Sequence, residues 1–361
     1  MVIPSTSTTN PFYFGGKIIN PARFVGRKAE LRFITQRMAG TQMTSVAVVG
    51  GRRIGKSSLI YHVYQTYYQR LDNPQRFLVG QVSLQDARVR TVAGFLQKVG
   101  SAIAQALSQH PDAATLPAWP VTCTELVTFS KSLQALAEAD LRTVLCLDEF
   151  EALLEAPDEF DDRFYDGLRA LMDDQLLMLI IASAKSLIYY GSRFRFVSRF
   201  FNLGNTLYLE EFPEDEAREL VMLPADVTGG PPALGVRDQE LALSLGGRHP
   251  FFLQMAAYYV CEAQATGRGE DWVRAQFRRQ AGPYRGLRRR LGQWMARQVW
   301  QAPAWLGRTA GWLGATWDDV RNWIVGILIL LLVILFLTGV LPMHEFLTWL
   351  LQVLGLGGGS Q

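Results

Sequence analysis

The chain has 361 residues, of which 49% are hydrophobic and 19% charged, so it can bury a sizeable core and is long enough for two domains. Its net charge of +3 is unevenly spread, because residues 1–270 hold 26 Lys/Arg and 29 Asp/Glu whereas residues 271–321 hold ten arginines and three aspartates. The charge distribution excludes an evenly basic fold. The positive charge is concentrated in residues 271–321, a segment suited to a membrane surface or nucleic acid. The three cysteines have no spacing that fits a zinc site.

The start of the chain predicts a loose tail followed by a helix. The N-terminus "MVIPSTSTTN" lacks the basic and apolar regions of a signal peptide, and residues 1–20 are expected to be flexible. Apolar residues then recur at helical spacing through Leu31, Ile34 and Met38, which predicts a short turn and then a helix within 24–40.

The middle of the chain alternates apolar runs with helical patterns. The expected strands are 44–49, 76–84, the first part of 143–154, 176–187 and 205–212. The expected helices between them are 57–70, 90–109 and 124–139. Strands that are apolar throughout are buried on both faces, so the alternation predicts an α/β fold with a parallel sheet covered by helices. From residue 213 to about 270 the pattern is mainly helical and predicts a small helical or winged-helix unit.

The segment after the strand at 44–49 carries a phosphate-loop pattern. Gly50, Gly55, Lys56 and Ser57 match G-x-x-x-x-G-K-[ST], the Walker A sequence. The glycines let backbone N–H groups surround a β-phosphate, the lysine supplies a cation for the β and γ oxygens, and the serine hydroxyl is a Mg²⁺ ligand. Because the match lies between a buried strand and a helix, the sequence predicts a P-loop nucleotide site here.

Two acids follow a later apolar strand, in "VLCLDEF", the Walker B pattern. Asp148 and Glu149 lie where that strand meets the carboxyl edge of the sheet, at which α/β folds bind ligands. Asp148 is expected to hold Mg²⁺ through water, and Glu149 to orient or deprotonate the attacking water. At the end of the next strand Ser183 is the candidate sensor of a γ-phosphate, with Lys185 and Ser186 as competitors. A strand-end serine that only satisfies the backbone is the alternative.

With these motifs in place, the chain resembles the STAND and archaeal-type ATPases of the AAA+ P-loop superfamily over about residues 20–265. "FVGRKAEL" is similar to the family's FVGRExEL box, with Lys28 in place of the usual glutamate, and "GGRRIGKSSL" is similar to its GxRRxGKTSL phosphate loop. "LDEFEALL", "FYDGLRALM" and "SRFFNLGNTLYLEEFPEDEARELV" match further motifs, with Arg199 standing where proline is usual.

The resemblance implies ATP and Mg²⁺ as ligands, and a loop before the first helix that lies against the adenine. The residues expected to bind the nucleotide are Phe24, Val25, Gly26, Arg27, Gly50, Gly51, Arg52, Arg53, Ile54, Gly55, Lys56, Ser57, Ser58, Ser183, His249 and Pro250. Catalysis is expected from Lys56, Asp148 and Glu149, and the metal ligands are expected to be Ser57 and Asp148.

Two further roles are implied for residues outside the Walker motifs. "GGRHPFFLQMAAYYV" is similar to a family segment in which His249 and Pro250 would relay the nucleotide state to the lid, with Arg248 as an extra residue. An ordinary histidine at a helix start is the alternative. Candidate arginine fingers, acting in cis or from a neighbouring subunit, are Arg169, Arg193, Arg195 and Arg199, and for each a surface salt bridge is the alternative.

The end of the chain predicts a transmembrane helix at 323–341, nineteen consecutive uncharged residues. Trp323 and Trp349 flank it as interfacial anchors would. The arginines between 274 and 297 suit an amphipathic helix on anionic headgroups, with a solvated linker as the alternative. The basic side of the span is expected to be cytoplasmic, which gives a single-pass protein of the inner membrane with its ATPase domain in the cytoplasm.

Six parts are therefore expected along the chain. They are a flexible tail (1–20), a P-loop ATPase domain (21–212), a helical lid or winged-helix unit (213–270), an Arg/Trp-rich juxtamembrane segment (271–322), a transmembrane helix (323–341) and a short apolar tail (342–361). The favoured function is a membrane-anchored, STAND-like switch that binds and slowly hydrolyses ATP, forms homo-oligomers and answers to an unknown protein partner or trigger. The alternatives are a nucleotide-gated effector that perturbs the bilayer with incidental hydrolysis, and, less favoured, an AAA+-like ATPase that binds DNA.

Overall fold

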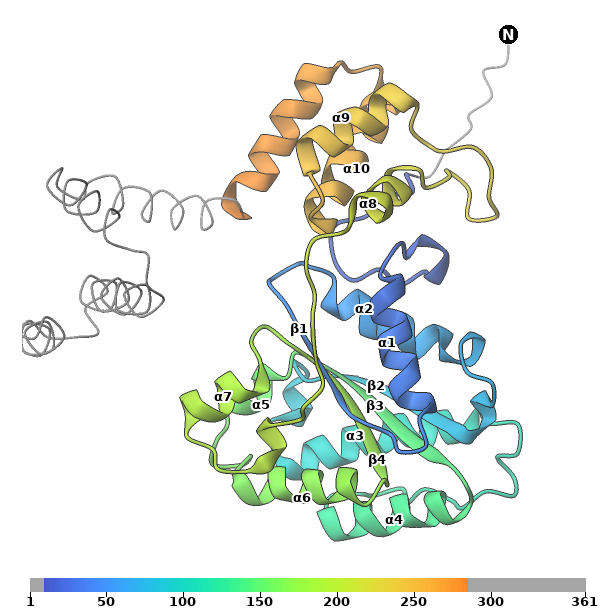
Figure 1. Ribbon diagram of the computed structural model, residues 1–361, viewed down its shortest axis with the longest axis vertical. Helices are drawn as coiled ribbons and strands as arrows, with labels where there is room; N and C mark the ends of the chain where they lie inside the picture. Colours follow the sequence, from blue (N-terminus) through green and yellow to red (C-terminus); the bar gives the residue numbers. More distant parts are fainter. Residues whose placement is uncertain (1–9, 285–361) are drawn as a thin grey trace, which may run out of the picture. The chain divides into compact units, whose positions relative to one another are not determined.

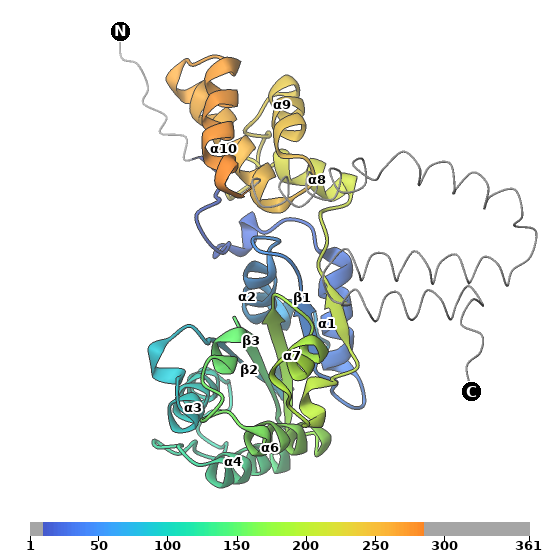
Figure 2. The same ribbon diagram turned by 90° about the vertical axis from the view of Figure 1, so that its left-hand side faces the viewer.

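The computed structural model describes residues 10–284 (Figures 1 and 2). The predicted transmembrane helix at 323–341, the apolar tail at 342–361 and the juxtamembrane segment beyond residue 284 lie outside the described residues. Within residues 10–284, no helix combines the length and the apolar character needed to cross a membrane.

A parallel sheet of five strands organises the first 212 residues. The strands are β1 (Val46–Val49), β2 (Phe77–Ser83), β3 (Arg142–Asp148), β4 (Leu177–Ser183) and β5 (Thr206–Tyr208). Their order is β2-β3-β4-β1-β5, and every neighbouring pair is parallel. Successive residues of β1 alternate between the hydrophobic clusters on the two sides of the sheet, which is why this run is apolar throughout. The predicted parallel α/β sheet is confirmed.

Helices cover both faces of the sheet (Figures 1 and 2). One face packs against α1 (Lys28–Ala39) and α2 (Lys56–Thr66). The other packs against α3 (Val92–Ser108), α4 (Leu126–Glu138) and α6 (Asp162–Asp173). The short helices α5 (Glu151–Leu154) and α7 (Leu187–Phe194) follow β3 and β4. The 3₁₀ turns are Pro21–Arg23, Tyr67–Gln69, Pro74–Arg76, Ala87–Val89 and Arg199–Phe201.

Two element boundaries have identifiable local causes. The helix predicted within 24–40 after a short turn is found, and it begins at Lys28 because Arg27 has φ +58° in the left-handed region and cannot continue a right-handed helix. The strand predicted at 176–187 ends at Ser183, because the Ser186 side chain accepts a hydrogen bond from the Tyr189 N–H and starts α7.

Residues after 212 form a helical unit, which we call the lid. It contains α8 (Glu214–Val221), α9 (Val236–Gly246), α10 (Pro250–Thr266) and a helix that is described from residue 270 to 284. Of the two predicted alternatives the helical one is found, since the described residues after 212 hold one isolated β-bridge and no strand that could form a wing. Val273, Phe277 and Ala281 are buried in the lid core, so this compact part extends past the predicted boundary at 270, to Gly282.

The predicted flexible tail at 1–20 is wrong for residues 10–18. Phe12 is buried in the lid core, and the Asn10 amide donates to the Tyr258 carbonyl. The Ile18 N–H donates to the Ser58 hydroxyl at the start of α2. The aromatic residues of "PFYF" show no periodicity, so the sequence alone did not reveal that they pack against α10.

Candidate nucleotide-binding site

The strand register brings the predicted motifs to one edge of the sheet. Val49 at the end of β1 is paired with Ser183 at the end of β4, and Ser83 at the end of β2 is paired with Asp148 at the end of β3. The phosphate loop directly follows Val49. Because all strands are parallel, their carboxyl ends meet, and this is the edge at which α/β sheets bind ligands.

The predicted phosphate loop forms the turn between β1 and α2. The Gly50 N–H donates to the Ser183 carbonyl (3.3 Å), and the Lys56 ammonium donates to the carbonyls of Gly50 (2.8 Å) and Gly51 (3.1 Å). Gly55 is the N-cap of α2 with φ +103°, a conformation that glycine adopts without strain. No side chain caps the helix there, so its first N–H groups are available to an anion.

Lys56 is a partly dehydrated cation among carboxylates. Burial lowers the pKa of its ammonium, and the charges of Glu151, Asp148 and Glu149 oppose that shift. Its two hydrogen bonds are to neutral carbonyls of its own loop. A phosphate would give this ammonium a charged acceptor, which makes a stronger hydrogen bond than a carbonyl does.

Asp148 has the features of a magnesium ligand. Its carboxylate is 5% exposed, and burial raises its pKa, whereas a hydrogen bond from the Ser57 hydroxyl lowers it. Its Oδ1 is buried and has no hydrogen-bond partner among the described residues. A buried carboxylate oxygen beside a serine hydroxyl is the hard-oxygen pair that Mg²⁺ prefers. Within residues 10–284 no cluster of three His, Cys, Asp or Glu side chains could bind a metal, so phosphate and water would supply the other ligands.

Glu149 follows the strand in a strained conformation. Its φ is +61°, in the left-handed region that non-glycine residues seldom occupy, and such strain is concentrated at functional sites. The Ser83 hydroxyl donates to its Oε2 at 3.2 Å. Burial raises the pKa of the Glu149 carboxyl, and the neighbouring charge of Asp148 raises it further. Ser83 was not predicted as a site residue. Its position near the end of the strand predicted at 76–84 could have indicated it, because the strand ends meet at the ligand-binding edge.

Ser183 lies at the predicted place, but its hydroxyl is turned to its own loop. Ser183 is 1% exposed, and its hydroxyl donates to the Lys185 carbonyl at 2.7 Å. This is the contact expected of a strand-end serine that satisfies the backbone. Lys185 is exposed, and Ser186 caps α7. Glu151 holds the same loop, since its Oε1 accepts hydrogen bonds from the Ala184 N–H and from the Tyr190 hydroxyl.

Two residues of the "FVGR" box make structural contacts within this edge. The Phe24 ring stacks on the His62 ring at 4.0 Å and 10°, and burial lowers the pKa of His62 to about 4, with a further contribution from Arg70. The Arg27 guanidinium, 3% exposed, donates to the carbonyl of Ile54 in the phosphate loop at 2.9 Å. Arg27 thus holds the phosphate loop through its guanidinium, and its predicted contact with the nucleotide stays a prediction.

The same box is tied to the lid through Glu216 of α8. Its carboxylate accepts hydrogen bonds from the backbone N–H groups of Arg27 (2.9 Å) and Lys28 (3.2 Å), at the start of α1. A side chain at Gly26 would place its Cβ 2.6 Å from Glu216 Oε2, and φ there is +72°, so only glycine fits. Glu216 was not predicted, because nothing local in the sequence reveals a contact across 189 residues.

We expect Glu216→Ala to destabilise the protein by about 2 kcal/mol, because one buried and one partly buried N–H donor would lose a charged acceptor. Glu219→Ala is the matched control, since Glu219 lies on the same helix and pairs with Lys28 in an exposed ion pair of little energetic value. Urea unfolding midpoints at equal slope would measure both. Equal midpoints for the two variants would contradict the expected role of Glu216.

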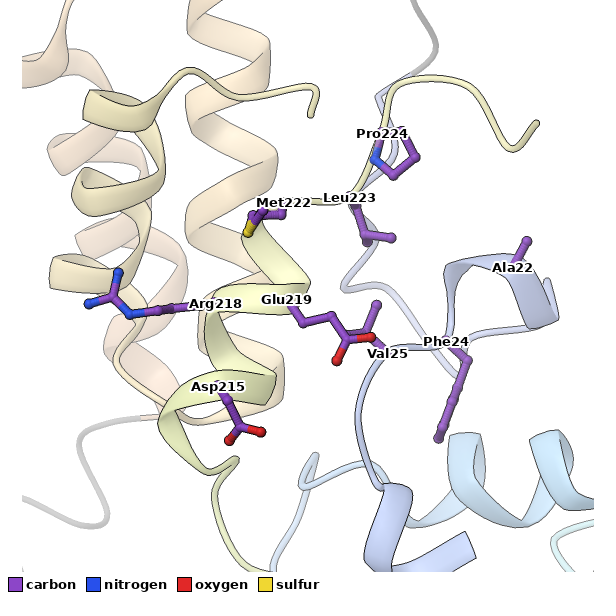
Figure 3. Close-up of a pocket in the computed structure, with 9 residues that line it drawn as sticks. All are labelled: Ala22, Phe24, Val25, Asp215, Arg218, Glu219, Met222, Leu223 and Pro224. Atoms are coloured by element: carbon purple, nitrogen blue, oxygen red, sulfur yellow. The ribbon is translucent and has the colours of Figure 1, made fainter. Parts of the chain in front are cut away.

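A pocket of about 430 Å³ opens beside the box (Figure 3). One side is formed by the loop before α1 and the other by α8 and the residues that follow it. Its lining residues are Ala22, Phe24, Val25, Asp215, Arg218, Glu219, Met222, Leu223 and Pro224. Phe24 and Val25, both predicted to lie against the base, therefore border a hollow of a size that small ligands occupy.

His249 and Pro250 begin α10, next to the phosphate loop. His249 is the N-cap and Pro250 the first residue of the helix. The guanidinium of Arg53, in the phosphate loop, lies 4.3 Å from the ring centroid of Phe251. Arg53 itself has φ +61°. The structure thus brings the predicted relay segment to the phosphate loop through Phe251.

Comparison with known proteins agrees with this geometry. Residues 23–181 match the family model described as "AAA ATPase domain". This part of the chain is therefore similar to AAA ATPase domains. The fold is similar to the ORC2 protein of Aeropyrum pernix in ADPNP–ADP complexes, with a TM-score of 0.53 and 18% identity over 74% of this chain and 71% of that one. It is also similar to a Walker-type ATPase of Pyrococcus abyssi, with a TM-score of 0.55 and 15% identity over 77% and 79%.

At these identities the likeness to the solved structures shows a shared fold. No curated protein matches the sequence. The predicted resemblance to AAA ATPases is confirmed for residues 23–181, and the narrower STAND assignment stays a prediction.

The four candidate arginine fingers fall into two groups. Arg169 forms an ion pair with Asp173, one helical turn away. Arg193, Arg195 and Arg199 are exposed, on α7 and on the 3₁₀ turn that follows it. The second group is therefore accessible to another molecule, whereas Arg169 is engaged within its own helix.

Proposed function

We propose that this chain is a Mg²⁺-dependent ATPase that works as a STAND-like switch. The observation that carries the proposal is the meeting of the phosphate loop, the Ser57–Asp148 pair and Glu149 at one edge of the sheet. A lysine, a serine hydroxyl, a buried carboxylate and a second acid are the groups that phosphoryl transfer to water requires.

Each side chain has a separate task in this proposal. Lys56 exchanges its loop carbonyls for phosphate oxygens, while the N–H groups at the start of α2 bind the same phosphates. Ser57 and Asp148 would hold the magnesium, which when bound supplies charge neutralisation on the phosphates. Glu149, whose pKa burial raises, orients a water and accepts its proton, and a raised pKa favours a general base at neutral pH. The base of the nucleotide lies in the pocket beside Phe24 and Val25.

The lid is the element through which the site would act as a switch. Arg27 contacts the phosphate loop and the Glu210 carbonyl just before α8, and its backbone is bound by Glu216 of α8. Movement of the phosphate loop on nucleotide binding or release would therefore shift the start of the lid. A switch needs such an element, whose position the ligand biases.

The surface around α7 supports assembly into homo-oligomers. Ile188, Tyr189, Phe194 and Val197 are exposed there, Val197 to 85%. Exposed apolar side chains gathered with arginines are typical of protein interfaces. In an oligomer, Arg193, Arg195 or Arg199 would be the candidate arginine finger for a neighbouring site.

The membrane anchor rests on the sequence of residues 323–341 and its basic approach. In the proposed arrangement the span places the ATPase on the cytoplasmic side of the inner membrane, where ATP and Mg²⁺ are available. A change of nucleotide state would then act on the bilayer through the C-terminal segment. An unidentified protein partner or trigger would set the nucleotide state.

The test is phosphate release by the full chain reconstituted into phospholipid vesicles. We expect phosphate release that needs Mg²⁺ and that rises per subunit with protein density. We also expect the full chain to float with the vesicles. A chain ending at Gly282 is the matched control and should stay in the soluble fraction. No Mg²⁺-dependent release would contradict the ATPase, and a full chain that fails to float would contradict the anchor.

A further inference from the structure

The segment Asn10–Ile18, here called the N-terminal strap, joins the lid to the phosphate-loop helix. Its first half is fixed to α10. The Asn10 amide donates to the Tyr258 carbonyl at 3.1 Å, and the Tyr13 N–H donates to Gln254 Oε1 at 3.0 Å. Phe12 is 2% exposed in the lid core. These contacts give the strap a defined place on the lid.

Phe14 is where the strap passes from the lid to the phosphate loop. Its ring meets the Tyr258 ring edge-on at a centroid distance of 5.2 Å. Its carbonyl accepts a hydrogen bond from Arg53 of the phosphate loop at 3.4 Å. One residue of the strap therefore contacts both α10 and the phosphate loop.

The second half of the strap lies on the first turns of α2. The Ile18 N–H donates to the Ser58 hydroxyl at 3.0 Å, next to the metal ligand Ser57. The Lys17 ammonium lies 4.3 Å from the centroid of the Tyr61 ring. Tyr61 follows Ser57 by four residues in the helix, so both project from the same face. Lys17 is thus on the Ser57 side of the helix start.

The electrostatics of the site agree with this placement. Burial raises the pKa of the Asp148 carboxyl, and the charges of Lys17 and Lys56 oppose that rise. Two lysines therefore act on the same carboxylate, one from the phosphate loop and one from the strap. Asp148, Glu149 and Glu151 place three carboxylates around Lys56, and a bound triphosphate would add further negative charge beside them.

We propose that Lys17 is a second phosphate-binding cation of the nucleotide site and that the strap carries it there from the lid. This inference rests on the proposed function. A lysine ammonium has three donors on a flexible stem, so Lys17 can leave the face of Tyr61 for a phosphate oxygen at the start of the same helix. Because the strap is fixed on α10, the lid position would set the distance of this cation from the phosphates, which links nucleotide affinity to lid docking.

The first test compares Mg-ATP binding by the full chain carrying Lys17→Met or Lys17→Arg. We expect Lys17→Met to weaken binding about tenfold, the size of one charge-assisted contact, and Lys17→Arg to stay within about threefold of the unaltered chain. The loss should shrink at high salt, because screening weakens exposed charges. Titration calorimetry at two salt concentrations measures the affinity of the unaltered chain and of both variants. Lys131→Met is the matched control, because Lys131 is an exposed lysine on α4.

The outcomes separate this inference from the proposed function. If neither the unaltered chain nor Lys131→Met binds Mg-ATP, the proposed function fails. If both bind, and Lys17→Met binds as tightly as they do, only the role of Lys17 is overturned. Equal weakening by Lys17→Met and Lys17→Arg would also overturn it, since the contact would then depend on shape and not on charge.

A second test asks whether the strap delivers the cation. Phe14→Ala loosens the strap from α10 while leaving Lys17 in place, so it should weaken Mg-ATP binding in the same direction. In the double variant Phe14→Ala/Lys17→Met the two losses should not add, because both act through one contact. Full additivity would overturn delivery by the strap.

Discussion

Replacement of Lys56 by alanine is expected to reduce Mg-ATP affinity about a hundredfold or more without unfolding the chain. The ammonium is a charged donor held against two carbonyls of the phosphate loop, and it would bond to more than one phosphate oxygen. Its present partners are two loop carbonyls, and burial already disfavours its charged form, so its removal costs the fold little. Titration calorimetry gives the affinity, and thermal unfolding without nucleotide gives the stability.

Lys131→Ala is the control for this experiment, because it removes the same kind of side chain from the exposed face of α4. Binding by Lys56→Ala that equals binding by this control would contradict the assignment of residues 50–58 as the phosphate loop. A drop in the unfolding temperature without nucleotide would instead show that Lys56 holds the loop together.

The fold could be predicted from the sequence because its signals are local. The runs "VAVV" and "LMLII" are apolar at every position, as is typical of a strand buried on both faces, and helical spacing separates them. The strand order was not predicted, because placing β4 between β1 and β3 depends on packing between distant segments. A boundary moved where one residue overrode the apolar pattern, as Ser186 did by capping α7.

The candidate site divides in the same way. Lys56, Ser57, Asp148 and Glu149 could be predicted because each lies in a contiguous motif whose spacing encodes the chemistry. Residues that act across long separations could not. Glu216 reaches the start of α1 from the lid, and no local pattern indicates its partner.

The N-terminal strap is a second case in which contacts between residues far apart in the sequence could not be predicted. Residues 10–18 lack periodicity and read as a tail, yet Phe12 is buried because α10 offers it an apolar face. A single aromatic residue that is buried in a core formed by distant segments produces no hydrophobic periodicity in the sequence. Burial by partners far along the chain is thus the common reason for the missed contacts.

Glu149→Gln is expected to separate hydrolysis from binding more cleanly than any other substitution at the site. Glutamine keeps the length and shape of the side chain, and its amide oxygen can still accept the hydrogen bond from the Ser83 hydroxyl. The strained backbone at φ +61° is therefore retained while the proton acceptor is lost. We expect phosphate release to fall about 10²- to 10³-fold, the range expected for loss of a general base.

Mg-ATP affinity in the same variant should be unchanged or tighter, because one negative charge beside the phosphates is removed. Single-turnover phosphate release and calorimetric titration of the same preparation test both expectations. Glu155→Gln is the matched control, since Glu155 follows the same strand but forms an exposed ion pair with Arg90. Release by Glu149→Gln at the rate of this control would show that the proton leaves by another route, whereas loss of binding along with release would show that Glu149 shapes the loop.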